Sequence, residues 1–208
     1  MTASGRKHLT MLRSFRLPDL LTFANASCGM LAIFLCLDYL ASGERHAIGW
    51  VFLLLPLALL FDVLDGVVAR WQKHFSAFGA DLDSLADSLS FGVAPAVLGY
   101  TLGLRGGWDV FILTFFVACG LSRLARYNVT AATLSDLKGK IRYYEGMPIP
   151  ANVLIVLMLG LAFTLNQVGD DIWLGGYAIG PALFHPLSLL YAISGSLMIS
   201  STLHIPKP

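Results

Sequence analysis

Long apolar segments with few charges decide what this chain can fold into. The 208 residues are 56% hydrophobic and 13% charged, with a mean hydropathy of +0.71, whereas soluble domains carry about 25% charged residues. Each apolar segment is close to the roughly 20 residues that cross a bilayer as a helix. The pattern predicts an all-α, polytopic integral membrane protein with six transmembrane helices, at approximately residues 17–40, 48–71, 79–102, 108–127, 149–166 and 185–202.

Two segments outside these spans have a composition of their own. Residues 1–16 place basic side chains among apolar ones, which predicts a short N-terminal amphipathic helix lying on an anionic membrane surface, with a disordered tail as the alternative. We expect this juxtamembrane segment to precede a single transmembrane domain over residues 17–208. Residues 173–184, ahead of the last span, are interpreted as a re-entrant or interfacial lead-in.

The positive charges are concentrated on one side of the predicted membrane. Of the 14 Lys and Arg residues, only Arg45 and Arg105 fall in loops on the side away from both termini. The positive-inside rule therefore places both termini at the cytoplasmic face of the cytoplasmic (inner) membrane. The formal net charge of +1 gives no indication of a nucleic-acid partner.

Four aspartates interrupt the apolar pattern where the second and third predicted spans meet. Asp62 and Asp65 lie near the end of one span, and Asp83 and Asp87 lie near the start of the next. Their spacings of three and four residues put each pair on one face of a helix, and the short connector makes the two spans antiparallel neighbours. Carboxylates this close repel one another unless a cation lies between them. Because Mg²⁺ and Mn²⁺ prefer oxygen ligands, the sequence predicts a divalent-metal site near the cytoplasmic face.

The stretch from Asp62 to Asp87 resembles the signature of the CDP-alcohol phosphotransferase family. That signature reads Asp, two residues, Asp-Gly, two residues, Ala-Arg, eight residues, Gly, three residues, Asp, three residues and Asp. The alternative, that these are ordinary aspartates at helix ends, is disfavoured because polar groups are unfavourable in so apolar a chain without a role. The matching positions are Asp62, Asp65, Gly66, Ala69, Arg70, Gly79, Asp83 and Asp87.

The resemblance implies transfer of a lipid-linked phosphate group from a CDP-lipid such as CDP-diacylglycerol to an alcohol, with release of CMP. It implies two Mg²⁺ or Mn²⁺ ions held by Asp62, Asp65, Asp83 and Asp87, with Asp87 also acting as the catalytic general base. Spacing alone does not identify the base. Family members also commonly form homodimers. Candidates for binding the CDP-lipid are Gly66, Ala69, Arg70, Gly79, Thr22 and Asn25, although Gly66, Ala69, Thr22 and Asn25 are also explained by helix packing.

Three strings beside the signature resemble the serine-accepting branch of the family, the phosphatidylserine synthases. They cover residues 82–96, 122–129 and 143–151. This resemblance implies L-serine as the acceptor and phosphatidylserine as the product; inositol phosphate, glycerol phosphate, choline and ethanolamine are the alternative acceptors. Serine carries a carboxylate, which a guanidinium can pair bidentately, and an ammonium group. Arg123 and Arg126 could supply such a guanidinium, or they could serve only to mark the cytoplasmic boundary. The candidate serine-binding residues are Arg123, Arg126, Glu145 and Ser88.

Two other classes of protein were weighed against an enzyme. An ion-coupled transporter also has acids within its spans, but near the bilayer midplane and in both halves of the chain. The four aspartates here lie toward one face and in one half, which disfavours a transporter. A binding or scaffold protein that retains an inactive signature is disfavoured because all four acids are intact.

Overall fold

A bundle of apolar helices dominates the computed structural model, which describes residues 17–72, 77–136, 143–200 and 204–206. The helices are α1 (Leu17–Ser42), α2 (Arg45–Trp71), α3 (Ala77–Asp87), α4 (Ala94–Thr101), α5 (Gly107–Asp136), α6 (Val153–Thr164) and α7 (Leu189–Ile199). The helix expected within residues 1–16 lies outside the described residues.

Short non-α turns extend three of these helices. A π-helical turn, Ser88–Val93, joins α3 to α4 without a break. One turn of 3₁₀-helix precedes α6 (Ile149–Asn152) and another precedes α7 (Pro186–Ser188). With α3 and α4 counted as one rod, the described residues contain six apolar helical rods, each at the place of a predicted span.

The length and surface of the helices are those of an integral membrane protein. Three described helical stretches, residues 17–42, 45–71 and 107–130, are long and apolar enough to cross a membrane, while Ile149–Thr164 and Pro186–Ile199 form shorter apolar helices. Large apolar side chains such as those of Phe34 and Phe111 are exposed on the outside, where hydrocarbon rather than water solvates them favourably.

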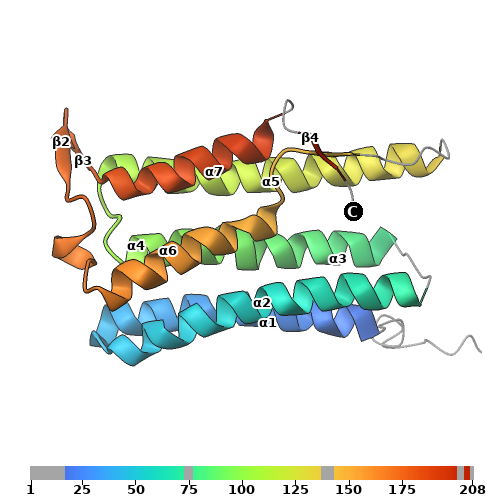
Figure 1. The fold of residues 1–208 in the computed structure, drawn as a ribbon, viewed down its shortest axis with the longest axis horizontal. Coiled ribbons are helices and arrows are strands. Elements are labelled where there is room, and N and C mark those ends of the chain that lie inside the picture. The colour runs from blue at the N-terminus through green and yellow to red at the C-terminus, as the bar shows by residue number, and fades with distance from the viewer. Residues whose placement is uncertain (1–16, 73–76, 137–142, 201–203, 207–208) are drawn as a thin grey trace, which may run out of the picture.

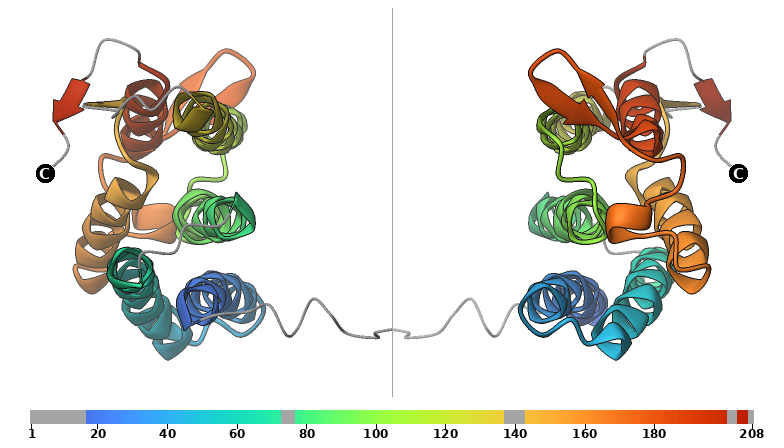
Figure 2. Two further views of the ribbon diagram at one scale, coloured as in Figure 1. Left: turned by 90° about the vertical axis from the view of Figure 1, so that its right-hand side faces the viewer. Right: turned by 90° about the vertical axis from the view of Figure 1, so that its left-hand side faces the viewer.

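The rods form two layers with nearly parallel axes (Figures 1 and 2). One layer contains α1, the α3–α4 rod and α5, and the other contains α2, α6 and α7 (Figure 2). The end of α2, the start of α3, the end of α5 and the end of α7 lie toward the same end of the bundle, which we call the aspartate end (Figure 1). The opposite end, the far end, contains the α1–α2 turn.

Two pairs of short antiparallel strands make the fold less purely helical than predicted. β1 (Tyr143–Glu145) pairs with β4 (His204–Pro206), and β2 (Tyr177–Ile179) pairs with β3 (Ala182–Phe184). The β2–β3 hairpin lies within the lead-in expected over residues 173–184, and it stands at the far end of the bundle without entering it (Figure 1). The Trp108 indole N–H donates to the Ile179 carbonyl at 2.9 Å and fixes the hairpin to the start of α5.

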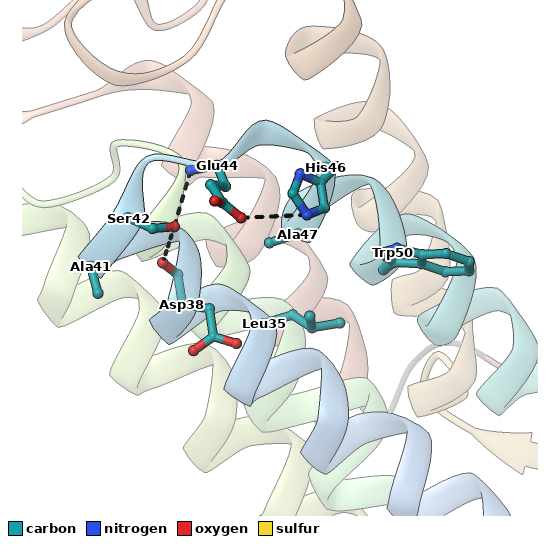
Figure 3. Close-up of a pocket in the computed structure, with 8 residues that line it drawn as sticks. All are labelled: Leu35, Asp38, Ala41, Ser42, Glu44, His46, Ala47 and Trp50. Atoms are coloured by element: carbon teal, nitrogen blue, oxygen red, sulfur yellow. Dashed lines mark hydrogen bonds and ion pairs between the residues drawn. The ribbon is translucent and has the colours of Figure 1, made fainter.

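A shallow hollow lies at the far end, beside the turn that joins α1 to α2 (Figure 3). The Glu44 carboxylate and the His46 imidazole form an ion pair at 3.4 Å there, and both side chains are largely exposed. Asp38 also lines the hollow and is exposed. Exposed pairs of this kind contribute at most about 1 kcal/mol to stability. The hollow is a surface feature at the end of the bundle opposite the aspartate end.

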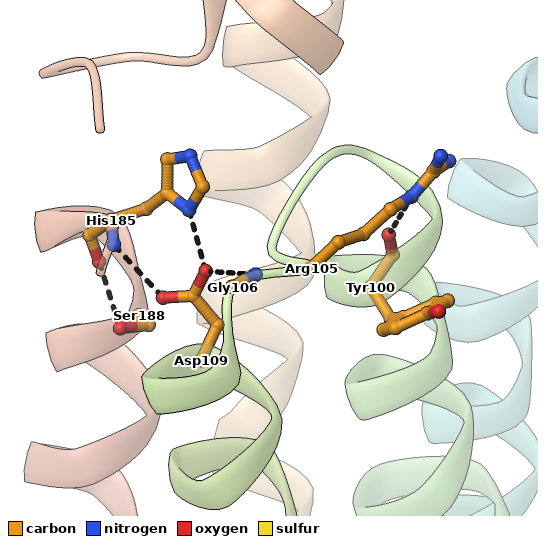
Figure 4. Close-up of polar contacts among 6 residues, drawn as sticks. All are labelled: Tyr100, Arg105, Gly106, Asp109, His185 and Ser188. Carbon is orange, nitrogen blue, oxygen red and sulfur yellow. Dashed lines mark hydrogen bonds and ion pairs between the residues drawn. The ribbon is translucent and has the colours of Figure 1, made fainter. Parts of the chain in front are cut away.

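The two arginines of the far end both bind the carboxyl ends of helices. Arg45 Nη2 donates to the Phe163 carbonyl at 3.0 Å, and its guanidinium lies 4.3 Å from the centre of the Phe163 ring. Arg105 donates to the Tyr100 carbonyl at 3.2 Å (Figure 4) and to the Thr101 carbonyl at 3.1 Å. Because the last carbonyls of a helix lack intrahelical donors and carry partial negative charge, these cations cap α6 and α4.

A buried carboxylate joins α5 to the segment that begins the last helix. Asp109 is 0% exposed, and its Oδ1 accepts the backbone N–H of His185 at 2.9 Å. Its Oδ2 accepts the Gly106 N–H at 2.9 Å and lies 2.5 Å from His185 Nδ1 (Figure 4). Gly106 and His185 are buried with the carboxylate. Asp109 therefore links the start of α5 to the segment that precedes α7.

Substitution of Asp109 by Ala is expected to lower the free energy of unfolding by about 3 kcal/mol, because it leaves buried donors on Gly106 and His185 without an acceptor. Denaturant unfolding in mixed micelles measures the change. Asp38→Ala is the matched control at the same end, and its exposed side chain predicts a change within about 0.5 kcal/mol. Equal effects of the two substitutions would contradict this account of Asp109.

Candidate active site

Three of the four predicted aspartates meet at the aspartate end, between α2 and α3. Asp62, Asp83 and Asp87 each offer one carboxylate oxygen, and these oxygens all lie within 4.8 Å of one another. The proximity predicted from the spacing and the short connector is therefore confirmed for these three residues. We call them the aspartate cluster.

Asp65 lies beside this cluster but is held by a different partner. Its side chain is 6% exposed, and its Oδ2 accepts the Thr22 hydroxyl at 2.9 Å. Its carboxylate repels that of Asp83 electrostatically. Asp65 therefore adds negative charge next to the cluster, and α1 determines the direction in which its carboxylate points.

The first helix supplies a second polar contact to the acids. Asn25 is 0% exposed, and its Nδ2 donates to Asp87 Oδ1 at 3.2 Å. Thr22 and Asn25 lie three residues apart on α1, so one helix face reaches both Asp65 and Asp87. Both residues were candidates for CDP-lipid binding, and in the structure they lie against the carboxylates.

Two buried oxygens at the site have no hydrogen-bond partner among the described residues, Asn25 Oδ1 and Asp83 Oδ1. A buried acceptor without a partner is unfavourable by about 1–3 kcal/mol. Oxygen donors, clustered negative charge and unused acceptors together fit a hard divalent cation such as Mg²⁺ or Mn²⁺.

The small residues of the signature line the same helices. Gly66, Ala69 and Gly79 are half-buried. A Cβ atom on Gly66 would meet, among described residues, only Arg70 Nη1 at 3.8 Å, an ordinary contact distance. Helix packing therefore does not require glycine at residue 66, which leaves open space beside the acids. Arg70 is exposed in the last turn of α2.

The residues predicted to bind serine come from three separate elements, α5, the π-helical turn and β1. Arg123 is half-buried and Arg126 is exposed, and both lie on α5. The Ser88 hydroxyl donates to the Leu85 carbonyl of its own helix at 2.7 Å. Glu145 belongs to β1, and its side chain lies outside the part of the chain that the structure describes.

Sequence reasoning missed a polar bridge between α3 and α5. The Ser84 hydroxyl donates to Asn128 Oδ1 at 3.1 Å, and Asn128 Nδ2 donates to Asp81 Oδ1 at 3.3 Å. Asp81 itself is exposed. Asn128 lies in one of the three flanking strings, yet nothing in its spacing indicated a partner 44 residues earlier.

Comparison with known proteins identifies the family of this chain. The sequence matches the model of the CDP-alcohol phosphatidyltransferase family over residues 15–193. The chain belongs to that family, whose members generally depend on divalent metal ions.

Three curated proteins that are similar in sequence to this chain have names that describe serine-accepting lipid synthases. The chain is 41% identical to a CDP-diacylglycerol–serine O-phosphatidyltransferase of Saccharomyces cerevisiae over 99% of this chain and 75% of that protein. It is 41% identical to an archaetidylserine synthase of Methanothermobacter thermautotrophicus over 64% of this chain and 53% of the relative. It is 34% identical to a CDP-diacylglycerol–serine O-phosphatidyltransferase of Mycobacterium tuberculosis over 77% of this chain and 54% of the relative.

Removal of one cluster carboxylate is expected to weaken the binding of Mn²⁺ by about tenfold or more, because each supplies an anionic oxygen donor. Asp62→Asn and Asp83→Asn test this, with binding measured by electron paramagnetic resonance of free Mn²⁺. Asp81→Asn is the control, since Asp81 is exposed and lies two residues from Asp83 on another face. Unchanged binding in both cluster variants would contradict a metal site here.

Proposed function

We propose that this protein transfers a phosphatidyl group from CDP-diacylglycerol to the hydroxyl of L-serine, giving phosphatidylserine and CMP. The observation that carries the proposal is the cluster of Asp62, Asp83 and Asp87 at the signature positions of the family. The names of the relatives support serine as the acceptor. The chain spans 75%, 53% and 54% of the lengths of the three relatives compared above.

The aspartates of the site are the proposed ligands of the metal ions that the reaction requires. Asp62, Asp83 and Asp87 would hold one or two divalent ions, Mg²⁺ or Mn²⁺, with Asp65 as a fourth predicted ligand oriented by Thr22. When bound, such ions neutralise the charge of the pyrophosphate and of the departing CMP. The open space beside Gly66 gives the nucleotide room to approach the helix backbone.

Asp87 is the proposed general base. Asn25 donates to Asp87 Oδ1 and so orients the carboxylate, which would accept the proton of the serine hydroxyl. Deprotonation makes that hydroxyl a stronger nucleophile toward the lipid-side phosphorus. The serine hydroxyl oxygen must come within about 3–3.5 Å of the phosphorus for reaction, so the base that takes its proton must be held in a defined position.

Cationic side chains on α5 are the proposed partners of the serine carboxylate. Arg123 and Arg126 lie one helical turn apart or less on that helix, and a guanidinium pairs with a carboxylate in a planar, bidentate arrangement. Glu145 and Ser88 remain the predicted partners for the rest of the amino acid. The binding of CDP-lipid by Ala69, Arg70 and Gly79 likewise remains a prediction.

The membrane position that we propose brings the site to the lipid headgroups. Asp65 precedes the end of α2 by six residues, a distance of about 9 Å at the rise of an α-helix. With six spans and the positive-inside orientation, the aspartate end faces the cytoplasm in the inner membrane. The acyl chains can then stay in the bilayer while the CDP headgroup reaches the acids. A homodimer remains a prediction from the family.

The acceptor is tested by the rate of CMP release from CDP-diacylglycerol by the purified protein. With Mn²⁺ present, L-serine is expected to support a faster rate than inositol phosphate, glycerol phosphate, choline or ethanolamine at equal concentration. Phosphatidylserine identified by mass spectrometry provides the product control. A faster rate with any other acceptor would leave the family membership intact and overturn serine as the substrate.

Asp87→Asn is expected to lower kcat by at least about 100-fold, because a carboxamide does not accept the proton. The rate of CMP release measures the loss. Asp38→Asn, at the far end, is the control and should retain the wild-type rate. An Asp87→Asn protein with wild-type kcat would refute the role of Asp87 as base.

A further inference from the structure

The helix that carries Asp83 and Asp87 changes its geometry directly after Asp87. Residues Ser88–Val93 form a π-helical turn, in which the N–H of Ala94 donates to the carbonyl of Leu89, five residues earlier. Such turns are rare and frequently mark functional sites. A π-turn accommodates one extra residue, which rotates the helix before it by about 100° relative to the helix after it. The direction in which Asp83 and Asp87 point therefore depends on this turn.

Pro95 explains why the turn forms at this place in the sequence. Proline has no N–H, and its ring collides with the carbonyl four residues earlier in an α-helix. That carbonyl belongs to Phe91, inside the π-turn. It is deprived of its usual donor and lies in an apolar bundle, where unpaired backbone groups are strongly unfavourable.

Asn152 supplies the missing donor from outside the helix. Its Nδ2 donates to the Phe91 carbonyl at 2.9 Å, and its Oδ1 accepts the Ser194 hydroxyl at 2.5 Å. Asn152 is 0% exposed and Ser194 is 5% exposed. The Phe91 carbonyl only accepts, so the carboxamide nitrogen must face it, and the Ser194 hydroxyl holds that orientation by donating to the oxygen at the other end.

The opposite side of the π-turn is fastened to the first helix. The Ser90 hydroxyl donates to the Asn25 carbonyl at 2.9 Å. A Cβ atom on Gly29 would lie 2.5 Å from Ser90 Oγ and 2.9 Å from Ser90 Cα, so α1 and the turn are in direct contact. The same Asn25 donates its side chain to Asp87. A shift of the turn would therefore also move the contact between Asn25 and the cluster.

We infer that Asn152, oriented by Ser194, is a positioning residue for the reaction: by binding the Phe91 carbonyl it maintains the π-turn that aims Asp83 and Asp87 at the substrate. This inference rests on the proposed phosphatidyl transfer. Asn152 touches neither the cluster nor the space beside Gly66, and its effect passes through the helix backbone.

Asn152→Asp is the sharpest variant, because it keeps the size of the side chain and an acceptor for Ser194 but removes the donor to Phe91. We expect kcat for CMP release to fall by about 100-fold, with little change in the KM for serine. We also expect weaker Mn²⁺ binding in electron paramagnetic resonance titrations, a measurement that does not depend on activity.

Tyr191→Phe is the matched control. The Tyr191 hydroxyl donates to the Pro95 carbonyl at 2.7 Å, a buried hydrogen bond to the same rod but beyond the π-turn. It should lower the melting temperature while kcat and Mn²⁺ binding stay near wild type. Losses of kcat and Mn²⁺ binding that are equal in the two variants would overturn the inference.

Pro95→Ala tests the same idea in a variant that should fold well. Alanine restores the N–H and allows an ordinary α-helix through Phe91, so the melting temperature should stay equal or rise while kcat and Mn²⁺ binding fall. Wild-type kcat and Mn²⁺ affinity in Pro95→Ala and Asn152→Asp would refute the inference. If the wild-type protein releases no CMP with serine, the proposed function fails, and the Mn²⁺ titrations of the three variants still decide the positioning role.

Discussion

Mutual repulsion between carboxylates within an apolar bundle is the constraint on which the rest of this structure depends. Asp62, Asp83 and Asp87 bring like charges within 4.8 Å of one another, and such a group is stable only when its surroundings hold it in place and a cation balances it. On α1, Asn25 donates to Asp87 of the cluster and Thr22 donates to the neighbouring Asp65. The first helix therefore belongs to the site, although the signature begins only at Asp62.

The two ends of the bundle meet different physical requirements. At the aspartate end, polar groups such as Asn25 Oδ1 and Asp83 Oδ1 remain without a partner among described residues, as suits a site that receives a ligand. At the far end, Asp109 satisfies its buried donors within the protein. Substrate chemistry and structural support are thus separated along the length of the helices.

Regular periodicity explains why much of this arrangement follows from the sequence. Apolar segments located the helical rods, and the spacing of Asp62, Asp83 and Asp87 located their shared face. The π-turn, by contrast, depends on a carbonyl at Phe91 whose partner, Asn152, lies 61 residues away. Pro95 hinted at a missing backbone hydrogen bond but not at its replacement. The β2–β3 hairpin was not predicted within the lead-in segment, because exposed apolar residues such as Tyr177 and Ile179 fit an interfacial segment of any secondary structure.

The capping of α6 and α4 by Arg45 and Arg105 has an electrical consequence. The carboxyl end of a helix carries about half a negative elementary charge, and each of these guanidinium groups lies directly on such an end. Their field is therefore partly cancelled within the folded bundle. The voltage across a membrane acts on net charge. Each arginine paired with a helix end therefore responds to that voltage less than a free arginine would.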